Sequence, residues 1–415
     1  MEEFRVGVIG LGNRGTEHVK NILTEREDVV VTALCDVYQD RIDNAKEICE
    51  SKRGWKDIFT TTDYKKVVEC DKVDIVFVFS SWDIHVPAAL YSMRHGKNVA
   101  IEVGGAYSLQ DCWDIVNAHE ETGVQCVMLE NCCYDRNEMM AMRMVREGLF
   151  GKIVAAEGGY MHDLRNEISM GKETRHYRLR NYMNRNCDNY PTHSMGPICK
   201  ILDINRGNRL VSLSSMASAS HGLNEYANIN PKVNPDYKTF AFNQGDIVKT
   251  NIKCANGELI SLTLDTSLPR YYSRNFTIRG TKGFFQEQTA SVFLDDVHGD
   301  EVPPEKRKDF HCNLDEYYKL YEHPVWKRFE EEGVKGGHGG MDWLIFDAYF
   351  EALKSGEVPP IDTYDTATWM AITPLSEMSI QTGGAPQAFP DFTRGAWMNR
   401  DEVNDKNHGF YALDR

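Results

Sequence analysis

The segment FRVGVIGLGNRG, residues 4–15, limits the fold of this chain more than any other stretch. An apolar run typical of a β-strand ends there in the glycine pattern GLGNRG. In a dinucleotide-binding turn, Gly10 permits a tight turn, Gly12 lets backbone N–H groups approach a pyrophosphate, and Gly15 lets the next helix pack closely on the strand. The N-terminus of that helix then faces the phosphates. The segment therefore predicts a dinucleotide site directly after the first strand.

A carboxylate at the end of the second strand indicates which dinucleotide binds. The strand-like run Val29 to Cys35 ends in Asp36, about 20 residues beyond Gly15, as the dinucleotide-binding pattern requires. Asp36 can accept hydrogen bonds from both ribose hydroxyls and would repel a 2′-phosphate, so the sequence predicts NAD rather than NADP. The alternative is a strand-end aspartate that only caps a turn.

Length, charge and cysteine usage exclude several classes of protein. A chain of 415 residues exceeds the size of a single core, so we expect two domains, residues 1–135 and 136–415. The formal net charge of −15, without a basic patch, argues against a nucleic-acid partner. No window approaches the roughly 18 apolar residues of a membrane span, and the first strand begins at Phe4, so we expect a soluble, cytoplasmic protein. The 11 cysteines lack the CxxC spacing of zinc sites, which predicts buried, reduced thiols and no metal.

Strand-like and helical runs alternate through the first 130 residues. This alternation predicts an α/β domain with a doubly wound parallel sheet, whose ligands bind beyond the carboxyl ends of the strands. We expect helices over 41–52, 62–70, 88–94 and 109–122, and further strands over 73–79, 98–103 and 125–129.

The pattern changes in the second half, where few helical runs separate the strands. A C-terminal α+β domain with a large open, mostly antiparallel sheet is therefore expected. We expect strands over 152–162, 209–219, 245–253, 259–267 and 273–278, another beginning at Phe284, and helices over 136–147, 341–353 and 364–381.

Four longer motifs narrow the interpretation: EGGYMHDL at 157–164, NYPTH at 189–193, GHGGMD at 337–342 and FPDFTRG at 389–395. With GLGNRG and the strand-terminal Asp36, the chain resembles the Gfo/Idh/MocA oxidoreductases, whose first domain is a Rossmann fold. Within that superfamily it is most similar to glycoside hydrolase family 109, the NAD-dependent α-N-acetylgalactosaminidases. The resemblance runs nearly end to end. It implies an NAD cofactor, a small glycoside substrate and a homodimer or homotetramer.

Carried over position by position, the resemblance and the glycine pattern assign residues to two ligands. The cofactor contacts are Gly10, Gly12, Asn13, Arg14, Gly15, Asp36, Trp82, Asp83, Ile84, His85, Glu102, Val103 and Asn131. The implied sugar contacts are Tyr160, Arg178, Tyr190, Pro191, Thr192, His193 and Tyr272, to which we add His162 and His338. Each has a purely structural alternative, such as a hydrogen-bonding histidine at a helix start or a solvated histidine in a glycine loop.

Two positions depart from the family pattern. Ordinary dehydrogenases of the superfamily have Glu-Lys-Pro where this chain has Glu102-Val103-Gly104, so the usual catalytic lysine is absent. Glycosidase-type members have Glu-Val-Pro, which favours them over a dehydrogenase. Glycine at 104, and Ser194 where a glycine usually follows the histidine, are the candidate positions for a difference in substrate.

The resemblance implies a reaction without the two carboxylates of most glycosidases. NAD takes hydride from carbon 3 of the sugar, the ketone acidifies the hydrogen on carbon 2, elimination expels the leaving group, water adds, and the hydride returns. His193 suits deprotonation of the carbon-3 hydroxyl, because an imidazole titrates near neutral pH and Pro191 can begin its helix. Tyr160, if nearby cations such as Arg178 lower its pKa, is the candidate base at carbon 2, and Tyr190 is the alternative.

Two other functions use the same residues. A net NAD-dependent sugar dehydrogenase or a glycoside lyase would stop at the 3-keto sugar or at the eliminated enone. A non-catalytic, NAD-dependent sugar sensor would bind without reacting, and the presence of Tyr160 and His193 argues against it.

Overall fold

A computed structural model describes residues 3–299, 301–400 and 410–413, which form two compact units. The first unit contains residues 3–131, 333–368 and 410–412, and the second contains 132–299, 301–332, 369–400 and 413. Residues 333–368, which the sequence analysis assigned to the C-terminal domain, therefore pack with the first unit. None of the helices in these ranges is long and apolar enough to span a bilayer.

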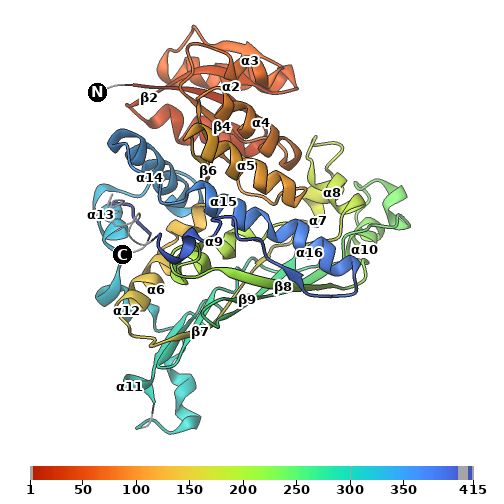
Figure 1. Ribbon diagram of the computed structural model, residues 1–415. Helices are drawn as coiled ribbons and strands as arrows, with labels where there is room; N and C mark the ends of the chain where they lie inside the picture. The colour runs from red at the N-terminus through yellow and green to blue at the C-terminus, as the bar shows by residue number, and fades with distance from the viewer. Residues whose placement is uncertain (1–2, 300, 401–409, 414–415) are drawn as a thin grey trace. The chain divides into compact units, whose positions relative to one another are not determined.

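The first unit is built on a six-stranded sheet in the order β3-β2-β1-β4-β5-β6 (Figure 1), and every pair of neighbours is parallel. The order reverses between β1 and β4, and such a reversal is where doubly wound sheets bind their ligands. The predicted parallel sheet is confirmed. Its strands are β1 (Phe4–Ile9), β2 (Val29–Cys35), β3 (Phe59–Thr61), β4 (Ile75–Val78), β5 (Asn98–Ile101) and β6 (Cys126–Met128).

Helices connect these strands as the alternation predicts. Five of them are α1 (Asn13–Asn21), α2 (Gln39–Arg53), α3 (Tyr64–Val68), α4 (Trp82–Arg94) and α5 (Leu109–Thr122). The predicted bounds of α5 are confirmed, because Ser108 and Asp111 form a capping box and Gly123 ends the helix in the left-handed conformation. The expected start of α4 at Ala88 is wrong. The helix begins at Trp82 and tolerates Pro87, which removes one backbone hydrogen bond.

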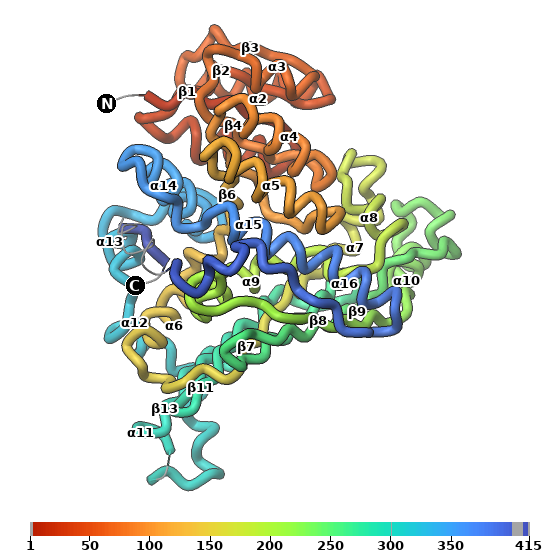
Figure 2. Tube along the Cα trace, viewed as in Figure 1, coloured from red at the N-terminus to blue at the C-terminus, as the bar shows by residue number. Residues whose placement is uncertain are grey.

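The C-terminal contribution to the first unit is helical and covers the sheet. It consists of α14 (Met341–Ser355) and the beginning of α15 (Thr363–Met370). The ring of Phe346 on α14 lies 5.1 Å from that of Phe77 on β4, and Phe350 lies 5.3 Å from Phe4 on β1. Figure 2 allows the blue trace of α14 to be followed beside the red and orange trace of this unit. Residues far apart in sequence thus share one apolar core.

The second unit is built on an eight-stranded sheet in the order β13-β12-β11-β7-β10-β9-β8-β14. Among the described strand pairs of this second sheet, only β7 and β10 are parallel, so the predicted large, mostly antiparallel sheet is confirmed. The strands are β7 (Ile153–Met161), β8 (Leu210–Ala217), β9 (Ile247–Cys254), β10 (Leu259–Asp265), β11 (Thr277–Gly280), β12 (Gly283–Gln286), β13 (Ser291–Leu294) and β14 (Gln387–Ala388).

Its helices are α6 (Arg136–Arg146), α7 (Arg165–Ser169), α8 (Arg178–Asn184), α9 (Thr192–Ile201), α10 (Gly222–Ile229), α11 (Asp295–His298), α12 (Leu314–Tyr321), α13 (Pro324–Glu332) and α16 (Ile372–Gln381). The prediction of a single helix over 364–381 is wrong, because the helix is interrupted at Ala371, between α15 and α16. The break places Pro374 in the first turn of α16, where its missing N–H costs nothing. The expected strand from Ser273 begins only at Thr277, after Asn275 adopts a φ of 51°.

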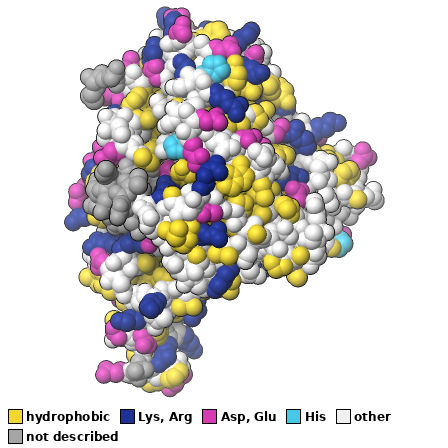
Figure 3. Space-filling view, viewed as in Figure 1, with side chains coloured by type: hydrophobic (Ala, Val, Ile, Leu, Met, Phe, Trp, Pro, Cys, Tyr) yellow, Lys and Arg dark blue, Asp and Glu magenta, His cyan; other side chains and the backbone are white. Residues whose placement is uncertain are grey.

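Charged side chains are mixed on the surface rather than segregated. Figure 3 shows lysines and arginines interspersed with aspartates and glutamates on the visible face. This face offers no continuous basic surface for a nucleic-acid backbone.

Candidate active site

The glycine turn between β1 and α1 has the shape that a pyrophosphate requires. Gly10 has a φ of 93°, and a Cβ placed on it would lie 2.6 Å from the backbone of Ser80. A Cβ on Gly15 would lie 2.0 Å from the carbonyl oxygen of Gly10, so α1 packs directly on the turn. At Gly12 the nearest atom to such a Cβ is 3.6 Å away, on the end of the Arg41 side chain. The backbone at Gly12 is therefore accessible to a ligand, and the turn fits an NAD phosphate.

Asp36 fixes the loop beside this turn. Its buried carboxylate accepts hydrogen bonds from the backbone N–H of Leu11 at 2.7 Å and of Tyr38 at 2.9 Å. The turn-capping role is thus present, and the ribose role remains a prediction. The sequence analysis missed Arg41, whose Nη1 lies 3.7 Å from Asp36 and whose guanidinium stacks on Tyr38 at 4.9 Å.

Glu102 follows β5 and is held by Arg14 and His18. Its Oε1 accepts hydrogen bonds from Arg14 Nη2 at 3.1 Å and pairs with His18 Nε2 at 2.7 Å. Its Oε2 accepts the N–H of Val103 at 3.0 Å. Burial acts to raise the pKa of Glu102, but Arg14 and His18 outweigh burial and lower the pKa to about 2. Glu102 is therefore a carboxylate at neutral pH.

Asp342 joins three further residues of the first unit. Its carboxylate accepts hydrogen bonds from Arg14 Nη1 at 3.0 Å and Asn131 Nδ2 at 2.7 Å, and it pairs with His338 Nδ1 at 2.9 Å. The predicted cofactor residues Arg14, Glu102 and Asn131 thus lie in one network. Asp342, which the sequence analysis did not assign, lies at its centre.

The predicted residues at the start of α4 have mainly structural contacts. Trp82 Nε1 donates a hydrogen bond to the carbonyl of Val103 at 3.2 Å. A Cβ on Gly104 would lie 2.3 Å from the Trp82 ring, so the indole explains glycine at this family-atypical position. His85 Nε2 lies 3.0 Å from the carbonyl oxygen of Ser80, and burial lowers the pKa of His85 to about 4. Asp83 and Ile84 lie half-buried in the first turn of α4.

In the second unit, the predicted sugar residues form an aromatic cluster. Tyr160 lies at the end of β7, and its ring centroid is 4.2 Å from Tyr190 and 5.6 Å from His193 in the first turn of α9. The rings of Tyr190 and His193 are 4.9 Å apart. Tyr272 lies 5.3 Å from His162 and is partly exposed. Five of the predicted sugar residues therefore lie together, and their contact with a sugar remains a prediction.

Arg178 is the cation of this cluster. It is buried at the start of α8, with its guanidinium 4.9 Å from the ring of Tyr190 and 5.9 Å from that of Tyr160. Its Nε forms an ion pair with Glu167 Oε1 at 2.8 Å. Arg178 thus lies within reach of Tyr160, as the sequence analysis expected. Glu167 was missed, since its helix α7 gave no sequence signal.

The protonation of the cluster differs from expectation at Tyr160. Burial raises the pKa of Tyr160, and Arg178 offsets only part of that effect. Burial and Arg178 together lower the pKa of His162, whose Nδ1 lies 3.3 Å from the Tyr160 hydroxyl. At neutral pH the His162 imidazole is therefore neutral and can accept a hydrogen bond from the Tyr160 hydroxyl.

The remaining predicted sugar residues lie in different places. Pro191 is the N-cap of α9, and Thr192 is fully buried in its first turn. His338 belongs to the first unit, where it contacts Asp342 and lies 3.2 Å from Arg14 Nη1. Among the predicted sugar residues, His338 alone is therefore part of the network around the glycine turn.

Ser194 connects α9 to β7. Its Oγ accepts the N–H of Gly159 at 2.6 Å and donates to the carbonyl of Gly159 at 3.0 Å. A Cβ on Gly158 would lie 2.5 Å from Ser194 Cβ. Ser194, the second residue that departs from the family pattern, thus fixes the distance between His193 on α9 and Tyr160 on β7.

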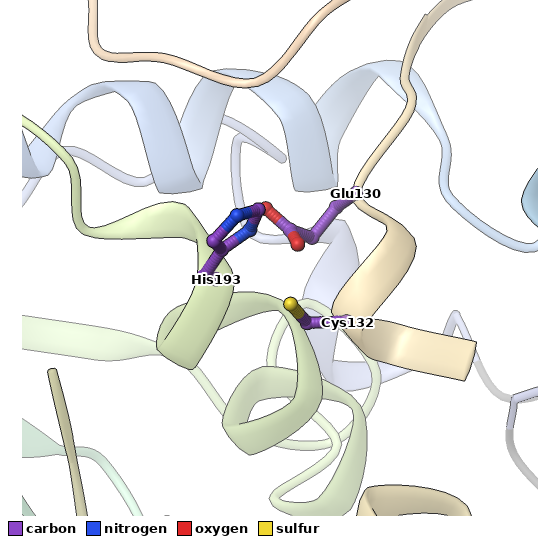
Figure 4. A group of neighbouring side chains, drawn as sticks. All are labelled: Glu130, Cys132 and His193. Atoms are coloured by element: carbon purple, nitrogen blue, oxygen red, sulfur yellow. The ribbon is translucent and has the colours of Figure 1, made fainter. Parts of the chain in front are cut away.

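A thiol adjoins the cluster. Figure 4 shows Cys132 beside His193, and both belong to the second unit. The Cys132 Sγ lies within 4.8 Å of a ligating nitrogen of His193. Both are metal-ligating types, but within the second unit they supply two ligands, whereas zinc sites use three or four. Cys132 was expected only as a buried thiol, and it is buried.

Two family models match the chain. The model for the C-terminal domain of glycosyl hydrolase 109 matches residues 134–399. The model for the oxidoreductase family with an NAD-binding Rossmann fold matches residues 4–130.

Similar proteins extend over almost the whole chain. An α-N-acetylgalactosaminidase of Tannerella forsythia is 39% identical over 419 residues, covering 96% of this chain and 88% of the relative. One of Shewanella oneidensis is 36% identical over 402 residues, covering 96% and 86%.

Solved structures share the fold. A levoglucosan dehydrogenase in complex with NADH and levoglucosan matches with a TM-score of 0.67 at 15% identity, covering 94% of this chain and 100% of that one. The Lactobacillus casei myo-inositol dehydrogenase with NAD(H) and myo-inositol gives a TM-score of 0.61 at 15% identity, covering 94% and 97%. These solved structures show only a common fold, whereas the two family models and the two relatives show the family. The chain belongs to glycosyl hydrolase family 109 and is a glycosidase with an NAD-binding Rossmann domain.

Proposed function

We propose that this protein hydrolyses α-N-acetylgalactosaminides or closely related hexosides by transient oxidation of the sugar at carbon 3. The observation that carries the proposal is the packing of Tyr160, Tyr190 and His193 around the buried cation Arg178. Proton transfer at two neighbouring carbons needs two bases, and this cluster contains an imidazole and two phenols. The names of the Tannerella and Shewanella relatives support the choice of sugar.

The redox part of the reaction depends on the cofactor. Bound NAD+ would supply the oxidant that takes hydride from carbon 3 and returns it at the end of the cycle. The glycine turn at Gly10 to Gly15, with Asp36, would hold its phosphates and adenosine ribose. Val103 stands where dehydrogenases of the superfamily have the catalytic lysine, which favours the glycosidase over the net dehydrogenase.

The residues of the second unit would move the protons. His193 would take the proton of the carbon-3 hydroxyl. Tyr160, as the tyrosinate, would remove the proton of carbon 2, and His162 Nδ1 lies 3.3 Å from its oxygen. Arg178 favours the tyrosinate, because a cation beside a phenol stabilises the charged form. Tyr190, closer to Arg178, is the alternative base.

The family resemblance also implies an oligomer, and the open sheet of the second unit is the candidate interface. We propose that the protein is a homodimer or homotetramer that pairs through this sheet. Light scattering coupled to gel filtration tests this, and a monomer at micromolar concentration would exclude it.

The enzymatic test follows both products at once. Purified protein is incubated with p-nitrophenyl α- and β-hexosides, including α-N-acetylgalactosaminide, while phenolate release and NADH absorbance are recorded together. We expect many turnovers of phenolate without accumulation of NADH. Stoichiometric NADH with a 3-keto sugar, and no sustained phenolate release, would identify a net dehydrogenase instead.

The variant His193→Ala tests the assignment of the first base. We expect loss of both phenolate release and transient NADH, with NAD+ binding unchanged. His221→Ala is the matched control, because His221 is an exposed histidine of the same unit at the start of α10. Activity that survives in His193→Ala would remove His193 from this role.

A further inference from the structure

We propose that Asp342 is a positioning residue for the cofactor site, acting through Arg14 and Asn131. The inference rests on the proposed NAD-dependent function and extends it to a residue far away in sequence. Asp342 begins α14, and its side chain is 1% exposed. A buried carboxylate is costly unless several donors surround it, so its partners identify its role.

The contacts of Asp342 converge on two predicted cofactor residues. Arg14 donates from Nη1 to Oδ2 at 3.0 Å and from Nη2 to Oδ1 at 3.3 Å, so the guanidinium binds the carboxylate through two nitrogens. Asn131 Nδ2 donates to Oδ1 at 2.7 Å. Such a paired contact fixes the plane of the guanidinium as well as its distance.

The two residues come from separate parts of the Rossmann sheet. Arg14 is in the first turn of α1, on the glycine turn, and Asn131 follows β6 at the edge of the sheet. Asp342 is the carboxylate that both contact, so its position sets theirs together. Arg14 also contacts Glu102, which extends the effect to the residue after β5.

The loop before Asp342 is shaped to place its carboxylate. His338, Gly339 and Gly340 have φ values of 50°, 66° and 106°, three successive left-handed residues. A Cβ on Gly337 would lie 2.5 Å from Asp342 Oδ2. Glycine at 337 thus leaves the space that the carboxylate occupies, and the GHGGMD motif gains a physical explanation.

Charge supports the same assignment. Burial acts to raise the pKa of Asp342, but the contacts with His338 and Arg14 outweigh it and hold the pKa well below its usual range. The contact with Asp342 is in turn the main cause of a raised pKa at His338. With Asp342 neutralised, the Arg14 guanidinium keeps its attraction to Glu102 and Glu17, with which it also pairs.

The direct test is titration of NAD+ into the full-length protein by calorimetry, with no sugar present. We expect Asp342→Asn to weaken NAD+ binding at least tenfold at a temperature where circular dichroism shows the variant to be folded. Asp347→Asn is the matched control, because Asp347 is on the same helix and pairs with Arg26 instead. We expect its Kd to stay within twofold of the parent. Equal affinity of Asp342→Asn and the parent would overturn the inference.

A second pair of variants displaces the carboxylate without changing any charge. Gly337→Ala would push on Asp342 and should weaken NAD+ binding, even if Asp342→Asn does not fold. Gly339→Ala is its control for backbone strain in the loop, because alanine is disfavoured at its φ of 66° but the new Cβ meets no atom within 4 Å. Unchanged affinity in Gly337→Ala would contradict the proposed role.

A double variant separates positioning from general destabilisation. If Asp342 acts through Arg14, Arg14→Ala with Asp342→Asn should bind NAD+ much more tightly than the product of the two single effects predicts. Fully multiplicative effects would exclude action through Arg14. Failure of the parent to bind NAD+ would instead refute the proposed function itself.

Discussion

Arg178 Nε lies 2.8 Å from Oε1 of Glu167, and this ion pair adjoins the ring of Tyr160. The two partners differ in burial, since the Arg178 side chain is 9% exposed and that of Glu167 is 37% exposed. The buried cation therefore faces the aromatic cluster, while the carboxylate partly neutralises it from the solvent side. The electrostatic effect on Tyr160 is therefore the sum of opposite contributions from Arg178 and Glu167.

This pair predicts opposite pH shifts for two variants. If Tyr160 acts as a tyrosinate, kcat rises with pH as the phenol loses its proton. Arg178 lowers the pKa of Tyr160 and Glu167 raises it. Glu167→Gln should therefore move the midpoint of the rise to lower pH, and Arg178→Met should move it to higher pH. Profiles of kcat between pH 8 and about 12 check this, because the pKa of Tyr160 lies above its ordinary value, and the exposed Glu225→Gln is the control. Shifts in the same direction would exclude the tyrosinate.

Gly104 should be required by the indole of Trp82 rather than by the substrate. In Gly104→Ala the new methyl would lie 2.3 Å from the Trp82 ring, so we expect a loss of about 1–3 kcal/mol in unfolding free energy. In the Trp82→Leu background the cost of Gly104→Ala should be smaller but not zero, because the φ of 156° at Gly104 also disfavours alanine. Urea denaturation measures both, and an equal loss in the two backgrounds would contradict the steric explanation.

Ser194 should act on stability rather than on sugar choice. Ser194→Ala leaves the buried N–H of Gly159 without this partner, which costs about 1–3 kcal/mol. Thermal and urea unfolding give the magnitude, and relative rates on the hexoside panel give specificity. A changed order of substrates at unchanged stability would show that Ser194 selects the sugar.

Asp188 should make the protein less stable as pH rises. This carboxyl precedes the NYPTH motif and is buried, and its Oδ2 has no hydrogen-bond partner among the described residues. Burial raises its pKa from 3.8 to about 7, opposed by Thr250 and the backbone of Tyr190. Between about pH 4 and 7 the folded state then binds more protons than the unfolded state, so its contribution to stability falls as pH increases.

The variant Asp188→Asn removes this dependence. We expect it to be more stable than the parent above pH 7, by up to about 4 kcal/mol, and similar to it near pH 4. Urea unfolding at pH 4.5, 6 and 8 checks the slope. A parent stability that is flat over this range would exclude a raised pKa at Asp188.

Local patterns predicted the elements whose ends are set locally. The bounds of α5 follow from the capping Ser108 and from Gly123, both readable in the sequence. The start of α4 and the break before α16 were predicted wrongly. Both helical runs contain a proline, and the sequence alone does not show whether a helix ends near a proline or continues through it.

The sequence predicted which residues belong to the candidate site, but not how they contact one another. Motif similarity identified Tyr160, Tyr190 and His193, which the structure brings together. The pKa of Tyr160 was expected to fall because Arg178 is near, but it rises, since the extent of burial cannot be read from residue types. The contacts of Asp342 with Arg14 and Asn131 span more than 200 residues of sequence, and no local pattern reports them.

The packing of α14 on the parallel sheet has a consequence for synthesis on the ribosome. The phenylalanines at 346 and 350 cover Phe77 and Phe4, so the apolar face of the first six strands is complete only after α14 has been made. Between residues 131 and 333 the ribosome adds about 200 residues, which takes about 10–40 s at roughly 5–20 residues per second. During that interval the nascent sheet exposes the apolar side chains that α14 later covers. A chaperone that binds apolar segments could bind there.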